Sequence, residues 1–156
     1  MNEKEITRAK NAAYRLLTYR PRSRKELEEK LQEREFGDAV TESVIAELMR
    51  LGYVNDREFA CQWAAGRIRL RGFGRCRIEQ ELRNKGIGRD LIQEALGEVF
   101  GETSEADIAR QEAEKKLKSL TRLVPEVRRR RLAGHLERRG FSSAIIYDVL
   151  RRVAAR

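Results

Sequence analysis

The sequence "RCRIEQELRNKGI", residues 75–87, is one of three copies of a single pattern in the chain. The other copies are "RKELEEKLQEREF" at residues 24–36 and "RRRLAGHLERRGF" at residues 129–141. In each copy a basic cluster leads to an apolar residue, and a leucine follows four places later. Another apolar residue lies five places after that leucine. Few residues are identical in all three copies, but the apolar positions agree, which indicates a repeated structural unit.

Apolar residues on both sides of Phe36, Ile87 and Phe141 fall at helical spacing. Leucine or isoleucine occurs nine and five residues before each of these three anchors, and apolar residues recur four, eight, nine and twelve residues after it. Each set follows one face of an α-helix. The residue after each anchor is small and suited to a turn or an N-cap: Gly37, Gly88 and Ser142. Each copy therefore predicts a helix, a tight turn and a second helix.

The spacing between copies leaves room for a third helix in each unit. It is 51 residues from Phe36 to Ile87 and 54 from Ile87 to Phe141. A stripe at Ala9, Ala13 and Leu17 recurs 51 residues later, and residues 108–120 supply a fainter third stripe. Start signals for the helices are a capping box, two weaker variants of it and a proline suited to the first helical position: Ser23 with Glu26, Asn55 with Glu58, Ser104 with Asp107, and Pro125.

We therefore predict an all-α protein of three tandem three-helix (helix-turn-helix-like) repeats, at residues 1–54, 55–103 and 104–156. Strand-like alternation is absent from the sequence. One unit of this size buries little apolar surface, so neighbouring units are expected to stack in series. Such stacking predicts an elongated, curved body.

The charge of the chain is high and unevenly distributed. The formal net charge is +9, and residues 106–156 hold 14 Lys and Arg against 6 Asp and Glu. The natural partners of such a surface are polyanions or acidic protein grooves. No apolar run approaches membrane-spanning length, and the first residues lack the apolar stretch of a signal peptide. A monomeric cytoplasmic protein that does not enter membranes is the expectation.

Residues suited to catalysis are sparse. His135 is the only histidine, and Cys61 and Cys76 do not have the spacing of metal ligands. The stretch "RGFGR" at residues 71–75 has two glycines, but no strand precedes it and no Gly-Lys-Ser/Thr follows. The sequence predicts neither an enzyme nor a metal or cofactor site.

Clusters of arginine are the strongest candidate binding residues. Two sets stand out, one nearly and one wholly free of acidic neighbours: Arg128, Arg129, Arg130 and Arg131, and Arg67, Arg69, Arg71, Arg75 and Arg77. A related group in the first unit is Arg20, Arg22, Arg24 and Lys25. Arginine suits bidentate contacts to phosphate or carboxylate. The alternative for any single arginine is a solvated helix end; for the set, repetition favours a binding surface, with Phe73 and Tyr19 as aromatic residues that could stack on bases.

Residues 51–87 resemble the signature of the RecX family, bacterial regulators of the RecA recombinase. The matching elements are a Gly-Tyr-Val-Asn-Asp stretch at 52–56, Phe-Ala at 59–60, an Arg-Gly-Phe-Gly turn at 71–74, and a helix end with Ile78, Glu81, Leu82, Lys85, Gly86 and Ile87. The opening "YRPRSRKELEEKL" is similar to the family's first repeat. Two departures affect turns: Arg75 stands where the family often has proline, and Glu35 where the other repeats have Gly86 and Gly140.

The resemblance implies a protein without catalysis of its own. RecX-like proteins bind RecA and lodge along the groove of the RecA–single-stranded-DNA filament, where they restrain ATP hydrolysis, strand exchange and coprotease activity. On this basis the two arginine sets are expected to contact RecA or DNA, with weak binding to single- and double-stranded DNA alone. Two alternatives stay open: an autonomous basic DNA-binding protein and an adaptor between other proteins.

Overall fold

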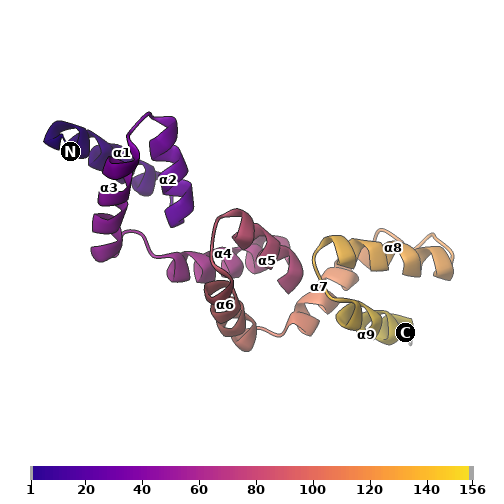
Figure 1. Ribbon diagram of the computed structural model, residues 1–156. Helices are drawn as coiled ribbons and strands as arrows, with labels where there is room; N and C mark the ends of the chain where they lie inside the picture. Colours follow the sequence, from indigo (N-terminus) through magenta and orange to yellow (C-terminus); the bar gives the residue numbers. More distant parts are fainter. Residues whose placement is uncertain (1, 155–156) are drawn as a thin grey trace.

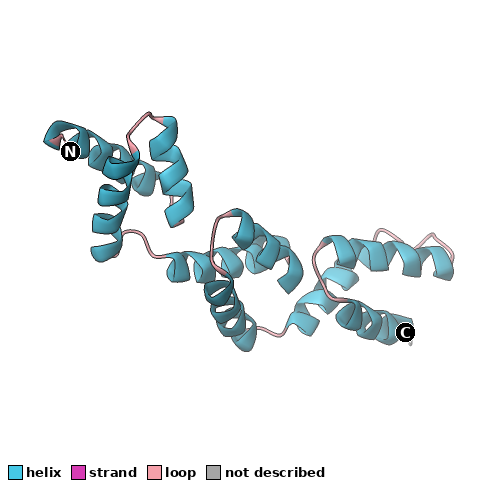
Figure 2. Ribbon diagram, viewed as in Figure 1, coloured by secondary structure: helices cyan, strands magenta, loops and turns pink. Residues whose placement is uncertain are grey.

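The computed structural model describes residues 2–154, and this part of the chain forms nine α-helices and no strand (Figure 2). The helices are α1 (Glu3–Tyr19), α2 (Arg24–Glu33), α3 (Asp38–Arg50), α4 (Asp56–Arg71), α5 (Arg75–Asn84), α6 (Arg89–Glu102), α7 (Glu105–Leu117), α8 (Pro125–Arg138) and α9 (Ser143–Ala154). Figure 1 shows them as three groups of three, strung out in chain order, with the two ends of the chain at opposite ends of an elongated, bent array. The predicted all-α fold of three three-helix repeats is confirmed.

Local capping signals start the helices where the sequence predicts. Ser23 and Glu26 form a complete capping box at α2, and the Asn55 side chain accepts a hydrogen bond from the Glu58 backbone N–H at α4. Ser104 does the same for Asp107 at α7, and α8 begins at Pro125. These contacts satisfy backbone N–H groups that have no partner within the helix.

Each repeat has its own apolar core. The second helix of each repeat contributes two fully buried residues four places apart, Leu27 and Leu31, Ile78 and Leu82, and Leu132 and Leu136. Small residues of the first helix let the helices approach closely, as Ala9 and Ala13 do in the first core. The turn between the second and third helices contains one residue with positive φ in every repeat, at Glu35, Gly86 and Gly140. The three repeats therefore share their internal packing and this turn.

Within residues 2–154, no helix has the length and apolar character that crossing a membrane requires.

Candidate functional site

The first junction, between the first and second repeats, is held by polar contacts at the start of α2. The Ser23 hydroxyl donates to the Lys85 carbonyl oxygen at 2.6 Å, and the Arg24 backbone N–H donates to Asp56 Oδ1 at 2.8 Å. Lys85 Nζ lies 3.3 Å from Glu26 Oε2. A helix N-terminus in one repeat thus meets a carboxylate and the C-terminal carbonyl of a helix in the next, an electrostatically favourable arrangement.

The second junction, between the second and third repeats, uses the same positions. The Gly74 backbone N–H donates to the Arg139 carbonyl oxygen at 2.7 Å, and the Arg75 N–H donates to Glu105 Oε1 at 3.0 Å. A further bond joins the Cys76 N–H to the Gly140 carbonyl oxygen at 3.0 Å. Gly74 and Arg75 lie 51 residues after Ser23 and Arg24, so the two junctions are built alike.

The positive-φ turn residue is glycine only in the two repeats whose turn packs against the preceding repeat. A Cβ on Gly140 would lie 2.5 Å from the Arg77 backbone nitrogen, and one on Gly86 would overlap the Lys25 side chain. Glu35 occupies the same place in the first repeat, and within residues 2–154 no other repeat docks against it. The departure from the family pattern at Glu35 therefore meets no steric obstacle in the described structure.

Phe73 is the apolar centre of the second junction and is only 6% exposed. Guanidinium groups surround its ring, with centroid distances of 4.0 Å for Arg77, 5.6 Å for Arg139 and 5.7 Å for Arg67. Such cation–π contacts are made over the face of the ring. The ring therefore does not offer a face to a base, and the expectation that Phe73 stacks on nucleic acid is wrong because Phe73 packs into the core of the second repeat beneath these guanidinium groups.

Three of the predicted binding arginines make contacts within or between repeats. Arg67 Nε lies 3.1 Å from Glu81 Oε1 in an ion pair without a well-aligned hydrogen bond, and its guanidinium lies 4.5 Å from the centre of the Trp63 ring. Arg77 donates to the Arg138 carbonyl oxygen at 3.0 Å. Arg75 donates to Gln93 Oε1 at 3.2 Å. These contacts give Arg67, Arg75 and Arg77 a part in packing.

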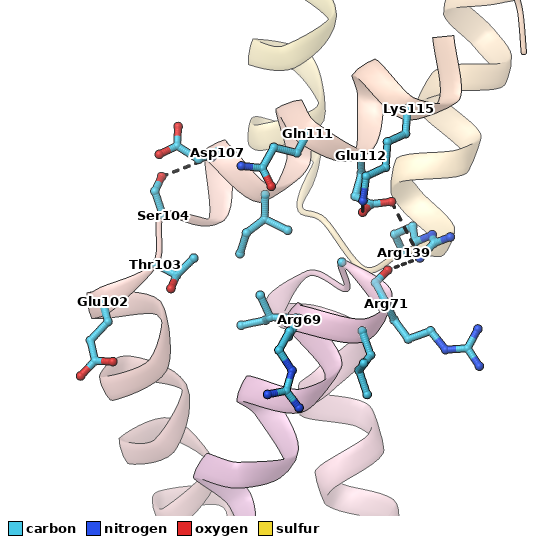
Figure 3. Close-up of a pocket in the computed structure, with 14 residues that line it drawn as sticks. Arg69, Arg71, Glu102, Thr103, Ser104, Asp107, Gln111, Glu112, Lys115 and Arg139 are labelled. Atoms are coloured by element: carbon cyan, nitrogen blue, oxygen red, sulfur yellow. Dashed lines mark hydrogen bonds and ion pairs between the residues drawn. The ribbon is translucent and has the colours of Figure 1, made fainter. Parts of the chain in front are cut away.

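Arg69 and Arg71 are exposed, as is Arg77, whereas Arg67 and Arg75 are half-buried. Unlike Arg77, the side chains of Arg69 and Arg71 have no ion pair or hydrogen bond within the described residues. The Arg71 backbone carbonyl accepts a hydrogen bond from Arg139, a residue that the sequence reasoning did not single out (Figure 3). Arg139 also lies 3.9 Å from a buried carboxylate, that of Glu112. Arg139 therefore joins α4, α7 and the Phe73 ring at the second junction.

The arginines at 128–131 occupy the positions of the third repeat that correspond to the junction contacts of the first two repeats. Counted back from the anchor Phe141, Arg128 corresponds to the N-cap residues Ser23 and Gly74. Helix α8 has 14 residues, whereas α2 and α5 have 10, so an extra helical turn replaces the free helix start found at the junctions. Arg129, Arg130 and Arg131 are exposed and Arg128 is half-buried. In the described part of the chain, none of the four forms an ion pair.

Four consecutive arginines on a helix cannot share one face, because successive side chains are about 100° apart. Arg128 and Arg129 line a cleft of about 550 Å³ beside the apolar residues Leu132, Leu150 and Val153. Arg130 and Arg131 line another cleft of about 530 Å³ with Lys116, Leu120, Gly134 and Arg138. All four charged residues of this second cleft are cationic, and we call Lys116, Arg130, Arg131 and Arg138 the basic cleft.

Sequence reasoning missed Lys116 and Arg138. Arg130, Gly134 and Arg138 are spaced by four residues along α8, a signal that places them on one helix face. Lys116 comes from α7 and carries no comparable signal.

Burial and the charges of Arg139 and Lys116 lower the pKa of nearby His135 below its ordinary value, although Glu112 opposes them. The basic cleft is therefore suited to phosphate or carboxylate oxygens.

Among residues 2–154, no group of three or more His, Cys, Asp and Glu side chains is placed to hold a metal ion.

The fold and the basic cleft together define a class of protein, the tandem three-helix-repeat proteins with a cationic surface cleft. Family models assign the repeats separately: the first RecX three-helix domain matches residues 9–48, the second matches 55–96 and the third matches 103–150. The chain belongs to the RecX family.

Similar proteins cover nearly the whole chain. A protein named Regulatory protein RecX from Amycolatopsis mediterranei is 35% identical over 149 residues, which are 96% of this chain and 85% of the relative. One from Thermobifida fusca is 37% identical over 92% of this chain and 77% of its own length. The crystal structure of RecX from Lactobacillus salivarius has a TM-score of 0.89 at 23% identity and covers 99% of this chain and 100% of that chain, a likeness of fold.

Proposed function

We propose that this protein regulates RecA by binding the RecA–single-stranded-DNA filament and restraining its ATP hydrolysis, strand exchange and coprotease activity. The observation that carries the proposal is membership of the RecX family through all three repeats, with relatives named as regulatory proteins. In this proposal the protein acts in the cytoplasm as a monomer, without catalysis and without a cofactor.

The shape of the array supports binding to a repetitive partner. Three similar units in series can meet successive subunits of a helical filament, and linked weak contacts give high avidity. Arg69, Arg71 and Arg128–131 supply cationic side chains for RecA or DNA. In the proposal, Arg77 holds the second junction through the Arg138 carbonyl oxygen and adds exposed charge, whereas the side chains of Arg67 and Arg75 stabilise the second repeat itself.

The test is the rate of ATP hydrolysis by a preformed RecA–single-stranded-DNA filament, with this protein added well below the RecA concentration. We expect a progressive fall in the rate. An unrelated single-strand-stimulated ATPase is the control and should keep its rate. Unchanged RecA hydrolysis at every ratio would contradict the proposal.

The second candidate is an autonomous DNA-binding protein, and the basic cleft is the observation that favours it. It predicts tight binding to DNA without RecA and an affinity that falls steeply with salt, because each neutralised phosphate releases counterions. If hydrolysis falls only when the protein is abundant enough to coat the DNA, this candidate replaces the first.

A further inference from the structure

Each junction also has a cleft beside its polar contacts. The second-junction cleft has a volume of about 560 Å³ and lies between the end of α4, the α6–α7 connection and α7, as Figure 3 shows. The first-junction cleft, of about 270 Å³, lies between the end of α1, the α3–α4 connection and α4. Both are open surface clefts at the place where one repeat ends and the next begins.

The two clefts are lined by equivalent residues. Superposing the repeats by sequence pairs six lining positions: Leu17 with Ile68, Pro21 with Gly72, Asn55 with Ser104, Glu58 with Asp107, Phe59 with Ile108, and Gln62 with Gln111. Four of the six pairs have the same chemical character: two are apolar, one is acidic and one is a pair of glutamines. The cleft is therefore a property of the junction, present twice at a spacing of one repeat.

A large apolar side chain is exposed beside each cleft, at the same position of the repeat. Tyr19 is 82% exposed and lies between two lining positions of the first-junction cleft, and Leu70 is 74% exposed and lines the second-junction cleft. The equivalent position in the third repeat is Ser119, and within residues 2–154 no junction forms beside it. An apolar residue is thus exposed at both junctions and replaced by a polar one where there is none. Exposed apolar groups rimmed by polar residues mark interaction sites.

The charges around the clefts favour protein over nucleic acid. Arg69 and Arg71 flank Leu70 in sequence and, within the described residues, neither side chain forms an ion pair, so the second-junction cleft can receive carboxylates. Glu102 and Asp107 also line this cleft, and Glu58 lines the other. This mixture of charges suits a protein segment whose few carboxylates meet Arg69 and Arg71 alone better than a continuous phosphate backbone, which would also meet Glu102 and Asp107, and base stacking gains nothing from Leu70. The acid-free basic cleft is better suited to phosphates.

We propose that the two junction clefts are docking sites for a protein segment that carries a large apolar side chain next to acidic residues, with one copy of the segment in each cleft. The apolar side chain covers Leu70 or Tyr19, and the carboxylates pair with Arg69 and Arg71 at the second junction. This inference rests on the proposed function, because a filament of identical subunits offers the same segment repeatedly.

The test compares the substitutions Leu70→Ser and Tyr19→Ser, which copy Ser119, with the wild-type protein. Tyr147→Ser is the matched control, since Tyr147 is 64% exposed on α9 and lines neither cleft. Affinity for the preformed RecA filament and for bare single-stranded DNA is measured separately, together with filament ATP hydrolysis. Helix content is followed by circular dichroism. We expect Leu70→Ser to weaken filament binding about tenfold and Tyr19→Ser about threefold, as central apolar contacts do. Tyr147→Ser should bind as the wild type does, and DNA affinity should be unchanged in all three.

The outcomes separate this inference from the proposed function. Filament binding by Leu70→Ser and Tyr19→Ser equal to that of the wild type overturns the docking inference alone, as does an equal loss of DNA affinity, which would make the clefts nucleic-acid sites. Wild-type binding that leaves hydrolysis unchanged overturns the proposed function alone. If the wild-type protein does not bind the filament, both fall.

Discussion

Arginines of the second and third repeats have the same place in the repeated pattern and different surroundings in the structure. Arg75 and Arg77, at the start of α5, contact Gln93, Phe73 and the chain end of α8. Arg129 and Arg131 lie at the same distances before the anchor Phe141, with Arg130 between them, and all three are exposed and form no ion pair within the described residues.

This difference shows that the position of a repeat in the array determines whether its basic residues are engaged in contacts or exposed. A basic helix start is useful at a junction, because the next repeat brings a carboxylate and a helix C-terminus to it. Within the described residues no such partner meets the start of α8, so Arg129, Arg130 and Arg131 stay exposed there. The repeated basic position therefore lies at a junction in the second repeat and on the surface in the third.

The largest effect is expected at the second junction, from Gly140→Ala. A Cβ at this residue meets the Arg77 backbone at 2.5 Å, and φ is 93°, a conformation unfavourable to alanine. We expect the free energy of unfolding to fall by about 3 kcal/mol, from backbone strain and the displaced junction. Urea denaturation measures it.

Gly86→Ala is the companion of this variant, because its Cβ would meet only the flexible Lys25 side chain. It should cost about 1–2 kcal/mol, mainly from its positive φ. Equal losses of stability in the two variants would show that the clash with the Arg77 backbone adds no cost beyond that of the positive φ. Close packing at the second junction would then not be the reason for glycine at position 140.

The next effect concerns the free arginines, tested by Arg130→Glu with Arg131→Glu. Reversing two charges of the basic cleft should weaken binding to single-stranded DNA about 30-fold and lower the salt dependence by about two ions, with little change in unfolding. Fluorescence anisotropy at several salt concentrations measures both.

The matched control reverses two arginines on α9 of the same repeat, Arg151 and Arg152, which pair with Asp148. The change in net charge is identical. An equal loss of DNA affinity in the control would show that net charge alone governs binding and that the basic cleft has no special part in it.

Local signals were sufficient to predict the helices, and they were insufficient for the contacts between repeats. The capping box at Ser23 and the first helical position of Pro125 depend on a few neighbouring residues, so the sequence predicts them well. The contact of Arg139 with the Phe73 ring joins residues that are 66 positions apart along the chain, so it depends on how the third repeat docks. Acidic partners at the junctions, such as Glu105, likewise come from the following repeat.

A smaller effect is expected at the first junction, from Glu26→Gln. Burial would raise the pKa of Glu26, but hydrogen bonds from Arg20 and Ser23 and the charge of Lys85 outweigh it and hold this pKa below its ordinary value of 4.5. A carboxylate with a lowered pKa contributes stability above pH 4.5 and loses it as the pH falls below that value. We expect Glu26→Gln to lower the free energy of unfolding by about 1–2 kcal/mol at pH 7.

The free energy of unfolding measured at lower pH tests the direction of the pKa shift of Glu26. The difference between wild type and Glu26→Gln should shrink as the pH falls below 4.5, because the wild-type carboxylate becomes protonated. Glu29→Gln is the control on the same helix: Glu29 is exposed and lies 3.9 Å from Lys25, so its loss should cost less than about 0.5 kcal/mol. If the difference in unfolding free energy between the wild type and Glu26→Gln stays constant down to pH 3, the charge of Glu26 does not stabilise the first junction.

The smallest effect, and one of opposite sign, is expected from Glu35→Gly at the free end of the array. Glu35 has a φ of 67°, which costs a residue with a side chain about 1 kcal/mol relative to glycine. Within residues 2–154 no repeat docks against this turn, so glycine is not required there for space. Glu35→Gly should raise the free energy of unfolding by up to about 1 kcal/mol, less the entropy that glycine adds to the unfolded chain. Urea denaturation beside Gly140→Ala measures the contrast at equivalent positions. A loss of stability in Glu35→Gly would mean that the glutamate side chain holds the end of the first repeat through contacts of its own.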